Sequence, residues 1–131
     1  MTYVSTYNQP VLYVPQTLSE IHDYLAGTMG NAPSFVDRTG FMPEHNIDRE
    51  FEGLLKGVEL NRKKLGEERY TRLIDLAARM KAAFAADPED KNGQANEGFR
   101  LLNQFEDEIQ DARRRRSKAK LKDDEGEVTG D

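Results

Sequence analysis

Apolar residues recur at helical spacing over two long segments in the second half of the chain. The first segment carries Tyr70, Leu73, Ala77, Met80 and Phe84, at alternating spacings of three and four. The second carries Ala95, Gly98, Leu102, Phe105, Ile109 and Ala112 with the same alternation. Both patterns are typical of amphipathic helices. Because only a short loop separates the segments, we expect an antiparallel helical hairpin with an apolar seam.

A further helix is predicted near the N-terminus, after a stretch of different character. Residues 17–20, with the sequence TLSE, match a capping box, in which the Thr17 hydroxyl and the Glu20 carboxylate accept backbone amides. The short helix that follows is expected to end at Gly27 or Gly30. Residues 1–16 are rich in tyrosine and valine but interrupted by two prolines, which predicts an extended arm.

The middle of the chain predicts one more helix, from about residue 43 or 48 to about residue 64. Its apolar positions are Ile47, Phe51, Leu54, Leu55 and Val58. Leu65 and Gly66 form its expected C-terminal stop. Gly53 and Gly57 make a GxxxG pattern, but the helix is too polar to dimerise in a membrane. Close packing of two helices, or chance, explains the pattern better.

Together these elements predict an all-α fold for the 131 residues. We expect a small antiparallel three- to four-helix bundle over residues 17–118, with the extended arm, 1–16, before it. Residues 119–131 are expected to form a disordered charged tail. The seams of the last two helices could also pair between chains, so a homodimer is possible.

Charge divides the chain into three zones under a net charge of −5. Residues 1–112 hold 12 basic and 19 acidic residues, residues 113–122 hold seven basic residues, and residues 123–131 hold five acidic ones. An acidic body repels phosphate backbones and suits a basic partner.

Candidate catalytic residues are few. Cysteine does not occur, and the two histidines, His22 and His45, match no metal-ligand spacing, so we expect no metal site and no cofactor. Glu106, Glu108 and Asp111 fall mainly off the apolar stripe, which predicts that they face solvent. No leader and no apolar run of membrane-spanning length is present, so we expect a cytoplasmic protein without membrane contact and without enzymatic activity.

The first functional hypothesis is a protein-binding module that occludes a basic partner protein. In size, acidity and lack of a catalytic motif, the chain resembles small acidic helical proteins of bacteria that act by binding another protein, among them the immunity proteins that neutralise toxins. Antitoxins and adaptors act in the same way. The candidate contacts are two tyrosine anchors and five carboxylates: Tyr13, Tyr24, Asp37, Glu44, Glu106, Asp107 and Asp111.

The alternative is a nucleic-acid-associated or phage-type assembly protein that uses the basic helix end. Its candidate contacts are Arg113, Arg114, Arg115, Arg116 and Lys118. Against it, neither basic residues of the body nor aromatic residues are expected near this segment, and the acidic tail would compete with phosphate. A solvated helix end, in which cations offset the terminal carbonyls, explains the same residues.

Overall fold

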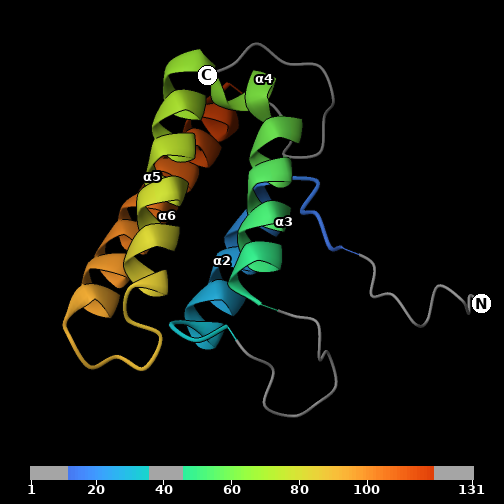
Figure 1. The fold of residues 1–131 in the computed structure, drawn as a ribbon. Coiled ribbons are helices and arrows are strands. Elements are labelled where there is room, and N and C mark those ends of the chain that lie inside the picture. The colour runs from blue at the N-terminus through green and yellow to red at the C-terminus, as the bar shows by residue number, and fades with distance from the viewer. Residues whose placement is uncertain (1–11, 36–45, 120–131) are drawn as a thin grey trace, which may run out of the picture.

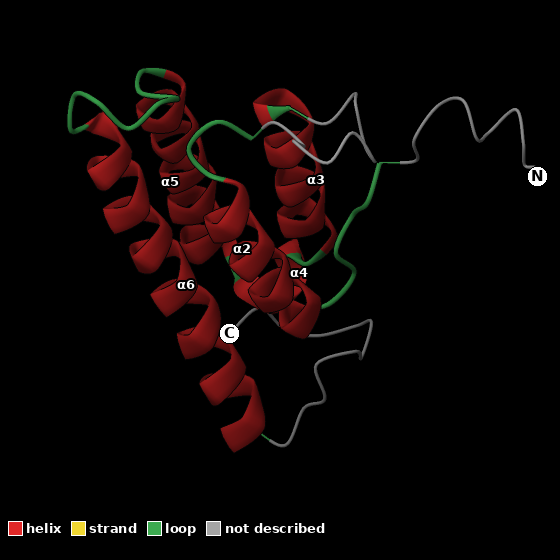
Figure 2. Ribbon diagram, turned by 90° about the horizontal axis from the view of Figure 1, so that it is seen from below, coloured by secondary structure: helices red, strands yellow, loops and turns green. Residues whose placement is uncertain are grey.

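The computed structural model describes residues 12–35 and 46–119 of the chain. Most of the predicted arm, the predicted tail from residue 120 onward, and two candidate contacts, Asp37 and Glu44, lie outside the described residues. Within the described ranges every regular element is a helix (Figures 1 and 2). The predicted all-α class is therefore confirmed.

Four long helices and one single-turn helix follow one another along the described chain. They are α2 (Leu18–Asn31), α3 (Ile47–Leu60), α4 (Arg62–Leu65), α5 (Glu67–Ala85) and α6 (Gln94–Lys118). The hairpin of α5 and α6 forms one side of the molecule, and α2 packs against α6 while α3 packs against α5 (Figure 1). The apolar seams of the hairpin are used within the chain, as the periodicity predicts.

The start of α2 follows the predicted capping box at Thr17, while Glu20 binds the amide one residue before the N-cap. Thr17 Oγ1 accepts a hydrogen bond from the Glu20 amide at 3.0 Å, and the Glu20 carboxylate accepts the Gln16 amide at 2.7 Å. The helix continues to Asn31, so the predicted end at Gly27 is wrong, while the alternative end at Gly30 lies one residue from the observed one. Neither glycine has a positive φ, and nothing lies near the position of a Cβ atom on either, so neither position requires glycine.

The predicted middle helix is broken in two at Asn61. This residue is fully buried, and its side-chain amide donates to the Gly57 carbonyl oxygen at 2.8 Å, one turn back in α3. The chain then makes the single turn of α4 and stops at Gly66, whose φ of 86° is a conformation that favours glycine. The predicted stop is confirmed, while the break at Asn61 has no signal in the apolar pattern.

Asp87 fixes the turn between α5 and α6. Its Oδ1 accepts the Lys91 amide at 2.6 Å, its Oδ2 accepts the Ala95 amide at 3.0 Å, and the residue is 2% exposed. Burial alone would raise the pKa of this carboxyl, but the backbone amides of Ala95, Lys91 and their neighbours hold the pKa below its ordinary value. Asp87 therefore satisfies amides at the start of α6.

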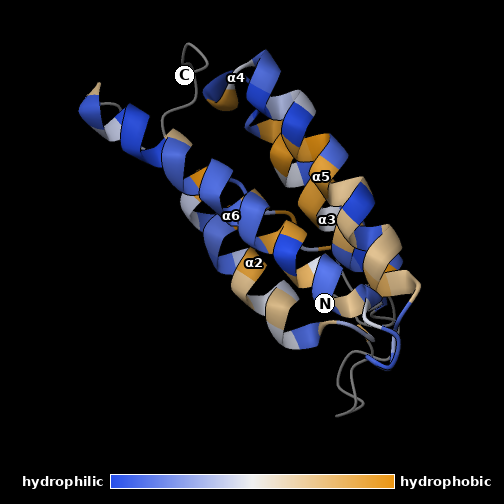
Figure 3. Cartoon of the chain, turned by 90° about the vertical axis from the view of Figure 1, so that its left-hand side faces the viewer, coloured by the Kyte–Doolittle hydropathy of each residue, from blue (hydrophilic) through white to orange (hydrophobic). Residues whose placement is uncertain are grey.

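The core runs through the middle of the molecule, where hydrophobic residues gather on α3 and α5 (Figure 3). Phe84 lies at its centre, with the ring of Phe35 at 5.5 Å and that of Phe99 at 5.1 Å, both in edge-to-face geometry. Gly98 makes room for this cluster, since a Cβ atom there would lie 2.6 Å from the Phe84 ring.

Candidate functional site

The N-terminal strap, which we define as Leu12–Gln16, crosses the outer side of α3 at its two glycines. A Cβ atom on Gly53 would lie 2.5 Å from the Tyr13 carbonyl oxygen and 2.5 Å from the Tyr24 hydroxyl. A Cβ atom on Gly57 would lie 2.5 Å from Pro15. The GxxxG pattern thus admits an extended segment and a tyrosine side chain, rather than the backbone of a second helix.

Two predicted anchors, Tyr13 of this strap and Tyr24 of α2, lie against each other, and we call them the tyrosine pad. Their rings are stacked, with centroids 5.7 Å apart and planes 12° apart. The Tyr24 hydroxyl donates to the Glu50 carbonyl oxygen at 2.7 Å, and Tyr24 is half-buried. Tyr13 is 57% exposed, so the pad presents one aromatic ring to solvent on a fixed support.

The electrostatic surroundings of the tyrosine pad are acidic. Burial raises the pKa of Tyr24 well above its ordinary value, with a further rise from Glu50 and an opposing effect of Arg49. Burial likewise raises the pKa of Tyr13, and the charges of Glu20 and Asp23 add to the shift. The carboxylates that act on them outnumber the cations.

An apolar residue extends the surface next to the pad. Leu60 is 59% exposed and follows Gly53 and Gly57 at a spacing of seven and three residues, on the same face of α3. The strap, with Pro15 on Gly57, leads from the tyrosine pad toward it. Tyr13 and Leu60 are two of the three large hydrophobic side chains that are exposed in the described part of the chain; the third is Met29.

A buried polar contact lies beneath this surface. Glu50 is 4% exposed, and its carboxylate accepts a hydrogen bond from the Thr28 hydroxyl at 2.5 Å. Thr28 is fully buried, and the Tyr24 carbonyl oxygen, 3.0 Å from its hydroxyl, shares the single hydroxyl proton with Glu50. The pair ties α2 to α3 directly below the tyrosine pad, and its burial keeps it from solvent.

The predicted carboxylate cluster of α6 turns inward to α5. Arg69, whose side chain is 7% exposed, binds Glu108 at 3.0 Å and also binds Asp111. Arg72 binds both oxygens of Glu108 at 3.0 Å, and these hydrogen bonds are the main cause of the lowered pKa of Glu108. The prediction that Glu108 faces solvent is therefore wrong, because arginines of α5 lie within reach across the hairpin. Asp111 also pairs with Arg69, but its side chain stays 39% exposed.

Glu106 points to α2 instead. Its Oε2 lies 2.5 Å from His22 Nδ1, and Gln110 approaches both groups, at 2.9 Å from the carboxylate and 3.2 Å from the ring nitrogen. The side chain of Glu106 is 23% exposed, so it too faces its neighbours more than solvent. His22, predicted as a surface residue, links α2 to α6.

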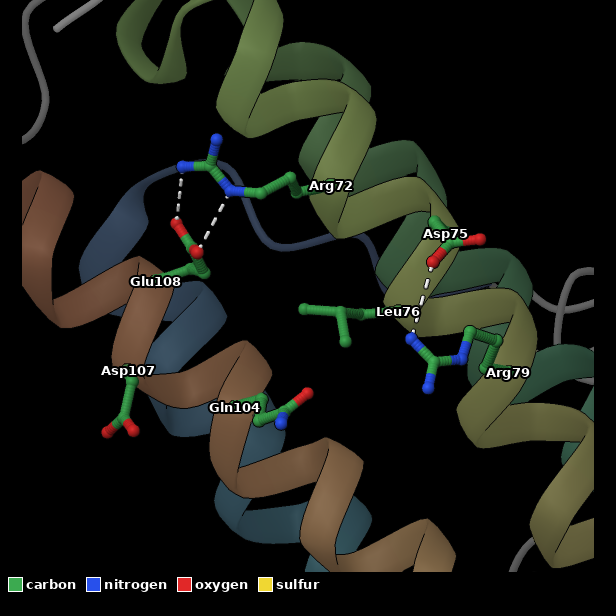
Figure 4. Close-up of a pocket in the computed structure, with 7 residues that line it drawn as sticks. All are labelled: Arg72, Asp75, Leu76, Arg79, Gln104, Asp107 and Glu108. Atoms are coloured by element: carbon green, nitrogen blue, oxygen red, sulfur yellow. Dashed lines mark hydrogen bonds and ion pairs between the residues drawn. The ribbon is translucent and has the colours of Figure 1, made fainter.

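A charged groove of about 420 Å³ runs along the outer side of the hairpin (Figure 4). Leu76 lies between two ion pairs, one formed by Arg72 with Glu108 and the other by Arg79 with Asp75. In the second pair, Arg79 Nη1 lies 3.5 Å from Asp75 Oδ2. Asp107 is exposed and points away from Arg72. Of the predicted contacts Glu106, Asp107 and Asp111, only Asp107 is as exposed as its prediction requires.

The basic segment continues α6 as far as Lys118. Arg114 and Arg115 pair with Asp111 at 3.4 and 3.5 Å, whereas Arg113 lies 3.4 Å from the Gln110 side chain. Arg116 is 2% exposed, so the prediction that it is a solvated cation is wrong. It follows Ala112 by four residues and continues the buried stripe of the helix.

The described residues contain no cluster of three or more histidine, aspartate or glutamate side chains that could hold a metal ion. In the same ranges, 12–35 and 46–119, no helix combines the length and apolarity needed to cross a lipid bilayer.

No family model, no curated protein and no solved structure matches this chain.

Proposed function

We propose that this chain is a non-catalytic protein-binding module, acting as an immunity-type inhibitor, antitoxin or adaptor in the cytoplasm. The tyrosine pad carries the proposal. Tyr13 combines 57% exposure with a ring already stacked on Tyr24. Tyrosine is enriched among the residues that dominate binding energy at protein interfaces. A ring that is fixed before binding loses little conformational entropy when a partner covers it.

Charge around the pad favours a basic partner. Glu20 and Asp23 both act on the Tyr13 hydroxyl, and both are carboxylates of α2. Complementary charge on a partner would raise the association rate and disfavour acidic competitors. Leu60 supplies apolar surface on the same face of α3. The mechanism is steric: the module covers a surface that the basic partner needs for its own activity.

The structure changes the ranking of the other predicted partner contacts. Glu106 and Asp111 contribute less, because each is already paired within the chain. Asp107 remains a candidate, exposed on α6 of the hairpin rather than next to the tyrosine pad. Asp37 and Glu44 remain candidates from the sequence alone.

The experiment compares capture of cellular proteins by the full chain and two variants, in lysate of the cells that make it. We expect the wild type to retain one basic protein, and Tyr13→Ala to weaken that interaction by at least about tenfold. Asn103→Ala, an exposed polar position on α6, is the matched control and should bind like the wild type. Equal capture by Tyr13→Ala, or no capture at low and moderate salt, would rule the proposal out.

A further inference from the structure

We infer that the end of the molecule formed by α4 and the last turns of α6 is a binding surface for double-stranded nucleic acid. Arg69 of α5 binds Asp111 of α6, and α4 precedes α5 by the single residue Gly66. The antiparallel hairpin therefore brings residues 62–64 to the same end as residues 113–118 (Figure 1). The expectation that no basic residues of the body lie near this segment is wrong.

Charge is strongly segregated along the molecule. Residues 62–69 and 108–119 hold nine basic and four acidic residues, a net of +5. The other described residues hold seven basic and thirteen acidic residues, a net of −6. The exposed carbonyls at the end of a helix are equivalent to roughly half a negative charge, so offsetting them does not use this many cations.

The accessible cations come from both helices. On α6, Arg114, Arg115 and Lys118 are exposed. On α4, Lys63 is exposed, whereas Arg62 is held by Glu67 through two hydrogen bonds of 2.7 and 2.8 Å. Because α6 stays helical to Lys118, its cations are displayed on a rigid rod rather than on a flexible segment.

The kind of ligand follows from what accompanies these cations. Proteins that bind single strands combine positive charge with exposed aromatic rings on which bases stack. Among the described residues, the aromatic ring at this end is Tyr70, which is partly buried with the Arg62 guanidinium 4.2 Å above it. Charge without a stacking surface favours contact with the phosphates of a duplex, independent of base sequence.

The acidic residues within 123–131 would compete with phosphate for the same cations. The test therefore uses the full chain, so that the measured affinity for DNA includes this competition. Fluorescence anisotropy of a labelled DNA duplex is measured at about 50 and about 200 mM salt. The wild type should bind at the lower concentration and weaken steeply at the higher one. The interaction does not depend on the tyrosine pad, so Tyr13→Ala should bind DNA normally.

Two variants test whether both helices contribute. Lys63→Gln should weaken binding about two- to fivefold and lower the salt slope by about 0.9, the value for one phosphate contact. Lys118→Gln on α6 should do the same. Both positions are exposed and stand outside the ion pairs of the described residues, so folding should be unaffected. Lys91→Gln, in the loop at the opposite end, is the control and should leave binding unchanged.

Three results would overturn the inference. The first is no binding of the duplex at the lower salt concentration. The second is binding that Lys118→Gln weakens and Lys63→Gln does not, because the surface would then belong to α6 alone. The third is binding to vesicles of anionic lipid without binding to DNA.

Discussion

In the α5–α6 hairpin, large buried side chains alternate along two long helices, and interhelical arginine–carboxylate pairs line one edge. On the α2–α3 side, a strap of five residues and one tyrosine approach the backbone of α3 at two glycines. The hairpin is stabilised by many similar contacts between buried apolar side chains of α5 and α6. The α2–α3 side depends on a few close approaches, each different from the next. The second arrangement is easier to alter locally, and it carries the tyrosine pad.

The largest expected effect belongs to the hairpin core. Phe84→Ala should lower the free energy of unfolding by about 3–5 kcal/mol, because it leaves a cavity between two other phenylalanines. Tyr13→Ala on the strap should cost less than about 1 kcal/mol, since the ring is largely exposed. Urea unfolding followed by circular dichroism measures both. Equal losses would contradict the contrast between the two regions.

Next in size is the loss of the buried arginine of the hairpin. Arg69→Met should lower the free energy of unfolding by about 2–3 kcal/mol. It removes the least exposed of the arginines that bind the neighbouring carboxylates of Glu108 and Asp111. Arg72→Met is the control, since this side chain is 49% exposed, and it should cost less than about 1 kcal/mol. Thermal unfolding of both variants at one pH would separate them. A smaller loss for Arg69→Met than for Arg72→Met would contradict the structure.

Two glycine-to-alanine substitutions, one in each region, compare how tightly the two regions are packed. Alanine improves intrinsic helix propensity by about 1 kcal/mol at either position. In Gly98→Ala the new methyl group meets the fully buried Phe84 ring, so we expect a net loss of about 1–2 kcal/mol. In Gly57→Ala the obstacle is Pro15 of the strap, which can lift away, so the free energy of unfolding should stay within about 0.5 kcal/mol.

For Gly57→Ala, two-dimensional NMR should show shifted resonances for Tyr13 and Tyr24 while the hairpin resonances stay in place. Unchanged tyrosine resonances would mean that the strap does not lie on Gly57.

The smallest expected effect is a pH dependence centred on Glu108. Hydrogen bonds from Arg72 are the largest cause of its lowered pKa; burial opposes them, and Arg69 adds to them. A carboxyl with a lowered pKa in the folded state stabilises the protein above its ordinary pKa of 4.5, and this stabilisation is lost as the pH falls through the folded-state value. Urea unfolding of wild type and Glu108→Gln between about pH 6 and about pH 3 should therefore show a steeper decline for the wild type. Parallel declines would show that Glu108 is not held by the arginines.

Some features of the fold follow from local sequence. Spacings of three and four between Tyr70 and Phe84 predict α5, because a helix can bury only residues on one face. The TLSE capping box predicts the start of α2, since the Thr17 hydroxyl needs only its own neighbours. The break at Asn61 and the burial of Arg116 have no comparable signal. At both positions a polar side chain is buried in the folded molecule, whereas an analysis of hydrophobic patterning predicts that polar residues are exposed.

The sequence predicts the residues of the tyrosine pad but not how they are arranged. Tyr13 and Tyr24 were predicted as separate anchors, eleven residues apart, and their stacking depends on the path of the strap over Gly53. Glu108 and Asp111 were predicted to face solvent because residue spacing on α6 says nothing about α5. The arginines that bind them are about 40 residues away in the chain.

By itself, the amino-acid sequence determined the helical class, the hairpin and the helix start at Thr17, because helical periodicity and capping depend on residues within one or two turns of each other. Only the tertiary structure decided that most carboxylates of α6 are paired, that two tyrosines form one pad, and that α4 lies at the same end of the molecule as the basic last turns of α6. Charge and aromatic pairing act through space at a few ångströms, and residues far apart in the sequence come within that distance only when the helices pack.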